Sequence, residues 1–145
     1  MPGVYVFDYD GTLRPLFCGD NRDEARQRVR DVIQYALDHG HVIGINTARL
    51  VLPSKHKKYL RSIGIDVDRL PSGAVQLGGI TSSKKVRNLE RIKQTYEAVY
   101  GPIQRIDMMF FDDKESNITA ARLAGYNAVL VKPVDGGCLA VSLRT

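Results

Sequence analysis

Short, strongly apolar runs that each end in a polar residue divide this chain. The clearest runs are Val4–Phe7, Val42–Ile45 and Ile106–Phe111, and segments with helical periodicity separate them. Strands that alternate with helices predict an α/β fold with a mostly parallel sheet. Because the runs are apolar at nearly every position, we expect helices to cover both faces of that sheet.

The spacing of apolar residues and the stop signals predict the remaining elements. Asn21 is expected to cap the first helix through a capping box with Glu24, and Gly40 is expected to end that helix. The other predicted elements are a helix over Ser54–Ile63, one or two weak strands between Ile65 and Leu77, a helix from Ser82 or Ser83 to just before Gly101, a helix over Asn117–Leu123 and a strand over Ala128–Val131.

The 145 residues fit one domain, and no repeat or linker divides them, so we expect a single Rossmann-like domain over residues 1–145. Hydrophobic residues make up 43% and charged residues 26%, as in ordinary globular proteins. No apolar run approaches the roughly 20 residues that span a bilayer, and the first apolar run is too short for a signal peptide. We therefore expect no membrane partner.

Two cysteines, Cys18 and Cys138, lie far apart in the sequence and lack the spacing of metal ligands. We expect two free thiols in a reducing compartment, and hence a cytoplasmic protein.

The ends of the apolar runs indicate where the chemistry lies. In open α/β sheets, ligands bind beyond the carboxyl ends of the strands. Asp8, Thr47 and the pair Asp112-Asp113 follow three of the predicted strands, so parallel strands would bring them to one edge. Asp10 is two residues after Asp8 and would point to the same side of an extended backbone.

Four carboxylates in one small volume require protonation or a cation. A magnesium ion with oxygen ligands from Asp8, Asp10, Asp112 and Asp113 is the natural solution beside a phosphate. Gly11 would let the backbone turn away or approach a ligand closely. Any one of these aspartates alone would be an ordinary turn residue, but four at the ends of two apolar runs favour a site.

Lysines open the third predicted helix, at Lys84 and Lys85. Solvated lysines are the ordinary interpretation. However, a lysine at a helix N-terminus opposes the helix dipole, and a site that offsets phosphate and carboxylates would explain its position there. Thr47 alone would be an ordinary turn residue, and it gains weight only from its place at the same edge.

These motifs together resemble the haloacid dehalogenase superfamily of phosphohydrolases. The four matching segments, in chain order, are Asp8-Tyr9-Asp10-Gly11-Thr12-Leu13, Ile43 to Thr47, Lys85, and Met108 to Asp113. Phe110-Phe111-Asp112-Asp113 followed by Asn117 is most similar to the magnesium-dependent phosphatase branch. The stretches after Asp10 and after Thr47 are short, so the chain resembles a member without a cap domain, with Arg14 to Asp20 as a small flap.

The resemblance implies a phosphatase that hydrolyses phosphate monoesters through an aspartyl-phosphate. Asp8 would be the nucleophile, and Asp10 the general acid and base. Magnesium would be bound by Asp8, the backbone carbonyl of Asp10 and Asp112, with Asp113 supporting the metal or Lys85. Thr47, Lys85 and backbone amides near Gly11 would bind the transferring phosphoryl group.

The substrate stays open between a phosphorylated small molecule and a phosphorylated polymer end. The alternatives are a nucleic-acid 3′-end phosphatase, a phosphoprotein phosphatase and a non-catalytic phosphate-binding scaffold. The basic segment from Lys55 to Arg61 is either a solvated helix face or a patch for polyanions, and the net charge of +5 suits an anionic partner without choosing one. Arg49 either touches the leaving group or lies on the surface, and the oligomeric state is open.

Overall fold

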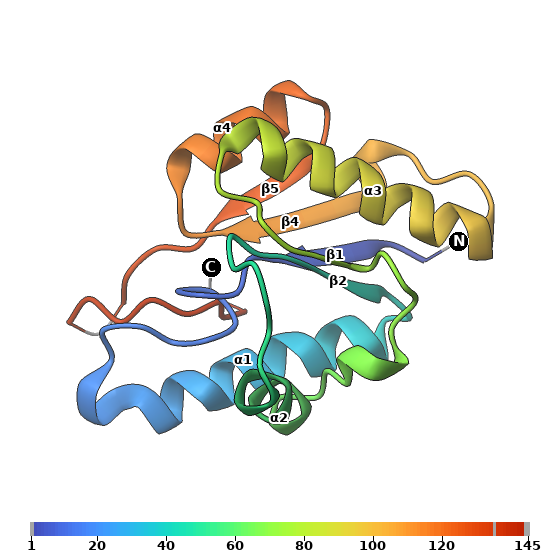
Figure 1. The fold of residues 1–145 in the computed structure, drawn as a ribbon. Helices are drawn as coiled ribbons and strands as arrows, with labels where there is room; N and C mark the ends of the chain where they lie inside the picture. Colours follow the sequence, from blue (N-terminus) through green and yellow to red (C-terminus); the bar gives the residue numbers. More distant parts are fainter. Residues whose placement is uncertain (1, 135, 144–145) are drawn as a thin grey trace.

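A computed structural model describes residues 2–134 and 136–143 of the chain. Five strands and four α-helices alternate along it (Figure 1). Their bounds are β1 (Val4–Phe7), α1 (Arg22–Asp38), β2 (Val42–Asn46), α2 (Ser54–Ser62), β3 (Val75–Gln76), α3 (Ser82–Tyr100), β4 (Met108–Asp112), α4 (Glu115–Leu123) and β5 (Asn127–Leu130). Short 3₁₀ turns lie at Gly19–Asn21, Val67–Arg69 and Arg105–Asp107.

The strands form one sheet in the order β3-β2-β1-β4-β5, and every pair is parallel. Helices α1 and α2 cover one face, and α3 and α4 cover the other (Figure 1). Val6 packs with the α3 and α4 side of the core, whereas its neighbour Phe7 packs with the α1 side. This alternation is what a strand between two helical layers requires. The predicted α/β Rossmann-like fold with helices on both faces is confirmed.

Several predicted boundaries move by a few residues. Asn21 precedes α1 as predicted but makes no side-chain cap, because a 3₁₀ turn delivers the chain to the helix with Asn21 outside the extended conformation that capping needs. Thr81, rather than Ser82 or Ser83, caps α3 by accepting a hydrogen bond from the Lys84 amide. Ile106 lies exposed in a 3₁₀ turn, so β4 begins two residues after the predicted start.

The segment between β1 and α1 forms the predicted flap, and the C-terminal segment pairs with it. Leu16 and Leu139 exchange both backbone hydrogen bonds, at 2.9 and 2.8 Å, and the Val141 amide donates to the Thr12 carbonyl. The connections after β1 and after β2 contain only turns and short helices. Among the described residues there is no separate cap, and no described helix has the length and apolar character needed to cross a membrane.

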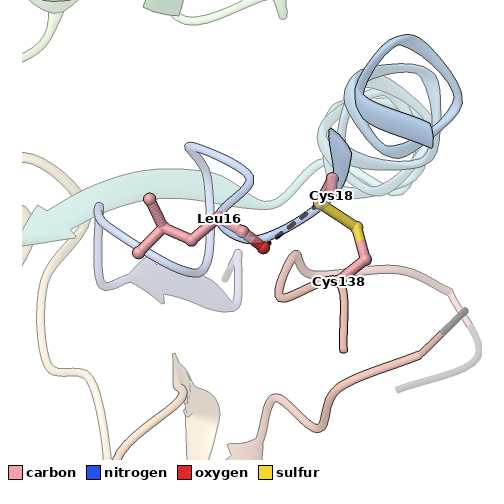
Figure 2. The surroundings of a disulfide bond; sticks show 3 residues. All are labelled: Leu16, Cys18 and Cys138. Atoms are coloured by element: carbon pink, nitrogen blue, oxygen red, sulfur yellow. Dashed lines mark hydrogen bonds between the residues drawn. A yellow bond between two sulfur atoms is a disulfide. The ribbon is translucent and has the colours of Figure 1, made fainter. Parts of the chain in front are cut away.

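The prediction of two free thiols is wrong, because Cys18 and Cys138 form a disulfide (Figure 2). They are separated by 120 residues in sequence, but the flap and the C-terminal segment lie side by side and bring their Cα atoms to 4.2 Å. The Cys18 sulfur also lies 3.2 Å from the Leu16 carbonyl oxygen. This covalent link removes the reason for placing the chain in a reducing compartment, and the cytoplasmic location stays a prediction.

Breaking this disulfide should destabilise the fold. A cross-link over so long a loop restricts the unfolded chain, and its loss typically costs about 2–5 kcal/mol. We expect dithiothreitol to lower the thermal midpoint of the wild type and to leave that of the Cys18→Ser/Cys138→Ser variant unchanged. An equal midpoint for the wild type with and without the reductant, at confirmed reduction, would contradict this expectation.

Candidate active site

The carboxyl ends of the three central strands meet at one edge of the sheet. β1 lies between β2 and β4, in register at Phe7 with Ile45 and with Phe111. The Asp8 amide continues this pairing by donating to the Phe111 carbonyl at 2.9 Å. A hollow of about 220 Å³ opens there, lined by Asp8, Asp10, Thr47, Ala48, Gly79, Ile80, Asp112, Asp113, Lys114 and Asn117. The predicted convergence of the strand ends is therefore present.

Asp8 is a buried carboxylate beside a buried ammonium group. Lys85 Nζ lies 2.8 Å from Asp8 Oδ1, 3.5 Å from Asp112 Oδ2 and 2.6 Å from the Asn46 carbonyl oxygen. Only 2% of the Lys85 residue is exposed. Burial raises the pKa of Asp8 to about 7; the Lys85 charge opposes this shift and the Asp112 charge adds to it. This carboxyl group therefore titrates near neutral pH while the site holds no cation.

A buried amide network holds Lys85 in place. Asn46 donates to the Lys85 carbonyl at 2.9 Å, and Asn88 donates to the Asn46 side-chain oxygen at 3.0 Å. Gly79 packs so closely that a Cβ there would lie 3.0 Å from Asn46 Oδ1. Sequence reasoning assigned no role to Asn46 or Asn88. In the sequence, Asn46 is marked only as a polar residue at the end of an apolar run, and Asn88 only as a polar residue one helical turn after Lys85.

Asp8, Asp112 and Asp113 each place a carboxylate oxygen within 4.8 Å of the others, and among the described residues they are the one such group of three or more His, Cys, Asp or Glu side chains. Asp112 is oriented by the Lys114 amide at 2.9 Å and by the Asn117 side-chain amide at 3.0 Å. Burial raises the pKa of Asp112. The Lys85 charge and the hydrogen bonds from Lys114 and Asn117 oppose this shift. A donor set made only of oxygen suits a hard divalent cation such as Mg²⁺.

Asp10 lines the same hollow, but its carboxylate is paired with two arginines. Arg49 contacts both oxygens, at 2.7 and 3.1 Å, and Arg14 Nε lies 2.8 Å from Oδ1. Burial alone would raise the pKa of Asp10, but the hydrogen bonds from Arg49 and Arg14 outweigh it and lower the pKa. Of the four carboxylates that were predicted to crowd together, three do so, and the fourth, Asp10, is paired with arginines instead. β1 ends at Phe7, so the alternation of an extended backbone does not reach Asp10.

Gly11 turns the chain with φ +80°, a conformation that favours glycine. A Cβ at this position would lie 2.7 Å from Asp113 Oδ2. The Gly11 amide donates to the Arg14 carbonyl at 2.9 Å, which closes the flap turn. The structure thus gives Gly11 a close approach to Asp113, and its predicted part in phosphate binding stays a prediction.

Thr47 lies at the wall of the hollow and is 1% exposed. Its hydroxyl oxygen accepts a hydrogen bond from the Arg49 amide at 3.1 Å, and its own amide donates to the Gln76 carbonyl of β3. These contacts fix the turn that carries Arg49 back to Asp10. Sequence reasoning left Arg49 open between the surface and contact with the leaving group; the structure pairs it with Asp10, and contact with a leaving group stays a prediction.

Comparison with known proteins identifies the fold alone. No protein-family model matches the chain, and neither does a curated protein. A solved structure of similar fold is that of an uncharacterized protein from Corynebacterium glutamicum. It is 19% identical, the match covers 90% of this chain and 85% of that chain, and the TM-score is 0.55. The resemblance to haloacid dehalogenase phosphohydrolases therefore remains a prediction.

Magnesium binding should be weaker at low pH. Asp8 has a folded-state pKa of about 7 against an ordinary value of 3.8, so the metal-free fold loses stability as pH rises between these values. At pH 6 the ion must displace a proton from Asp8, whereas at pH 8 it need not. We expect magnesium affinity, measured by calorimetry, to be about tenfold weaker at pH 6 than at pH 8.

The matched variants for this measurement are Asp112→Asn, in the acidic group, and Asp31→Asn, exposed on α1. Asp112→Asn should lose magnesium binding, and Asp31→Asn should keep it. Equal binding by these two variants would show that magnesium binds elsewhere.

Proposed function

We propose that this protein is a magnesium-dependent phosphohydrolase that acts on phosphate monoesters through an aspartyl-phosphate at Asp8. The observation that supports this most is the buried Asp8 carboxylate at the end of β1, held 2.8 Å from Lys85 and beside Asp112 and Asp113 at the wall of one hollow. A nucleophile, a cation and a set of oxygen ligands are what phosphoryl transfer requires in one place.

Asp8 attacks the phosphorus atom in the first step. A bond forms between a carboxylate oxygen and phosphorus, and the bond between phosphorus and the ester oxygen breaks. Lys85 holds Oδ1 at 2.8 Å, whereas the Thr12 hydroxyl lies 3.4 Å from Oδ2, so Oδ2 is the freer oxygen for attack. In the second step water attacks phosphorus, and inorganic phosphate and the free Asp8 carboxylate are released.

Asp10 supplies and accepts the protons. It donates a proton to the leaving ester oxygen and later takes one from the attacking water. The hydrogen bonds from Arg49 and Arg14 lower the pKa of Asp10 and so favour its ionised form, which suits the second step. To carry a proton for the first step, Asp10 must lose at least one of these arginine contacts. Substrate entering the hollow next to Asp10 is the event that would rearrange them.

Asp8, Asp112 and Asp113 fit a magnesium ion, because their oxygens lie close together and their mutual repulsion needs a cation. When bound, the ion would neutralise the charge of the phosphate and of these carboxylates. Lys85 adds a fixed positive charge, and Thr47 offers a hydroxyl at the same wall. Both groups would hold the transferring phosphoryl oxygens.

Loss of the nucleophile should abolish hydrolysis. Asn at position 8 keeps the size of the side chain but lacks the carboxylate that must bond to phosphorus. We expect wild type to hydrolyse nitrophenyl phosphate only with magnesium, and Asp8→Asn to be inactive with magnesium or with a chelator. Full activity of Asp8→Asn would refute the assignment, and a wild type inactive on every phosphate ester would favour a phosphate-binding scaffold.

The loss of activity caused by replacing Asp10 should depend on the leaving group of the ester. General acid catalysis typically contributes about 10²–10⁴-fold, and a nitrophenolate leaves without much help from a proton. We therefore expect Asp10→Asn to lose far more activity on an alkyl phosphate than on nitrophenyl phosphate, measured as kcat/KM. Equal losses on the two esters would exclude Asp10 as the general acid.

A further inference from the structure

A second hollow lies beside the candidate active site, and its polar wall is almost entirely basic. It measures about 220 Å³, and its basic lining residues are Arg14, Arg22, Arg26, Lys55 and His56. Tyr9, Pro15 and Tyr59 complete the wall. Among the residues that the structure describes, none of those lining this basic hollow is acidic. So many cations in one hollow indicate an anionic ligand.

Two helices bring these charges together with their N-terminal turns. Arg22 is the first residue of α1, and Lys55 and His56 lie in the first turn of α2, on the same side of the sheet (Figure 1). A cation at a helix N-terminus opposes the helix dipole. Pro53 precedes α2 without a side-chain cap, and the first turn of α2 has no acidic residue. The first turn of α1, by contrast, carries Asp23 and Glu24, so it is at α2 that an anion would favourably offset the basic first turn.

Arg26 supplies a second, independent observation. Its Nε is buried and has no hydrogen-bond partner, although its guanidinium lies 5.4 Å from the centre of the Tyr59 ring. The nearest carboxylate oxygen in an ion pair with it belongs to Asp23, at 3.9 Å, and the Asp23 side chain is 97% exposed. A buried donor without an acceptor is unfavourable. The Arg26 side chain as a whole is 37% exposed and lines the basic hollow, where its charge would attract an oxyanion.

The wall of the basic hollow is preorganised by hydrogen bonds. The Tyr9 hydroxyl lies 2.6 Å from His56 Nδ1, and the Tyr59 hydroxyl donates to the Leu13 carbonyl at 2.7 Å. Burial, together with the charges of Arg49 and Lys55, lowers the pKa of His56. The arginines and Lys55 therefore provide the positive charge at neutral pH, and the hydrogen-bonded Tyr9, His56 and Tyr59 form the ordered part of the wall.

Arg14 joins the two hollows. It lines the basic hollow, and its Nε lies 2.8 Å from Asp10 Oδ1, while Asp10 lines the active-site hollow. The Arg14–Asp10 ion pair thus links the lining of one hollow to that of the other. A volume of about 220 Å³ is below the usual range for drug-sized ligands and suits a single phosphate group rather than a chain of nucleotides.

We propose that the basic hollow binds a second phosphate group of the substrate, so that the preferred substrate is a small phosphate ester that carries two phosphates. This proposal rests on the proposed phosphatase function. One phosphate lies at Asp8 and is hydrolysed, and the other is held by Arg22, Arg26 and Lys55. The basic face of α2, left open between solvation and polyanion binding, thereby gains a specific part in substrate selection.

Binding of inorganic phosphate tests the basic hollow without catalysis. With a chelator present, the carboxylates of Asp8, Asp112 and Asp113 repel phosphate, so binding reports the basic hollow. We expect calorimetry to detect phosphate binding to the wild type, and Arg22→Gln/Lys55→Gln to weaken it about tenfold or more. The control Lys58→Gln/Arg61→Gln removes the same total charge, from exposed positions of α2 outside the basic hollow, and should bind as the wild type does. No binding by the wild type, or equal weakening in both variants, would overturn the proposal.

Kinetics then test the substrate. With magnesium, the wild type should have a kcat/KM about tenfold or more higher for an alkanediol bisphosphate than for the matching monophosphate. Arg22→Gln/Lys55→Gln should lose this preference and Lys58→Gln/Arg61→Gln should keep it. Equal rates on the two esters, or a preference for a 3′-phosphorylated oligonucleotide that survives Arg22→Gln/Lys55→Gln, would overturn the proposal. Phosphate binding at the hollow without hydrolysis of any ester would refute the phosphatase and leave only an anion site.

Discussion

The buried ammonium group of Lys85 is the interaction on which the site depends. It lies between Asp8 and Asp112 and also donates to the Asn46 carbonyl, so it joins α3 to the ends of β1, β2 and β4. Its charge offsets those of two neighbouring buried carboxylates, which would otherwise be unfavourable in their ionised form. Its position is costly, since a lysine is rarely so buried. The Asn46 and Asn88 amides hold the backbone that presents it.

Local sequence patterns predicted the parts of this fold that depend on neighbouring residues. Apolar runs identified β1, β2 and β4, and their polar ends identified the edge where Asp8, Thr47 and Asp112 meet. The position of Lys85 was predicted for a related reason, since a lysine that opposes a helix dipole needs an explanation. Because parallel strands end at the same edge of a sheet, residues that follow separate strands lie close together, and the location of the candidate site could be predicted before its contacts were known.

Features that depend on long-range pairing could not be predicted in the same way. The arginine pair on Asp10 joins residues that are four and 39 positions away, and the disulfide joins residues 120 positions apart. The spacing of apolar residues along the sequence carries no information about such pairings. The C-terminal segment after β5 has no regular structure to predict, and its path along the flap is fixed by two backbone hydrogen bonds with Leu16. Its residues Cys138, Ala140 and Val141 are nevertheless buried in the core.

The pairing of the flap with the C-terminal segment has a consequence for synthesis on the ribosome. β1 and the flap emerge among the first residues, but Cys138, Leu139 and Val141 are translated more than a hundred residues later. Contacts so distant in sequence form late. The pairing of β1 with β4 also waits for the last third of the chain. A nascent chain can therefore pair β1 with β2 early, whereas the acidic edge of the sheet and the contacts of the flap are both completed only near the end of synthesis.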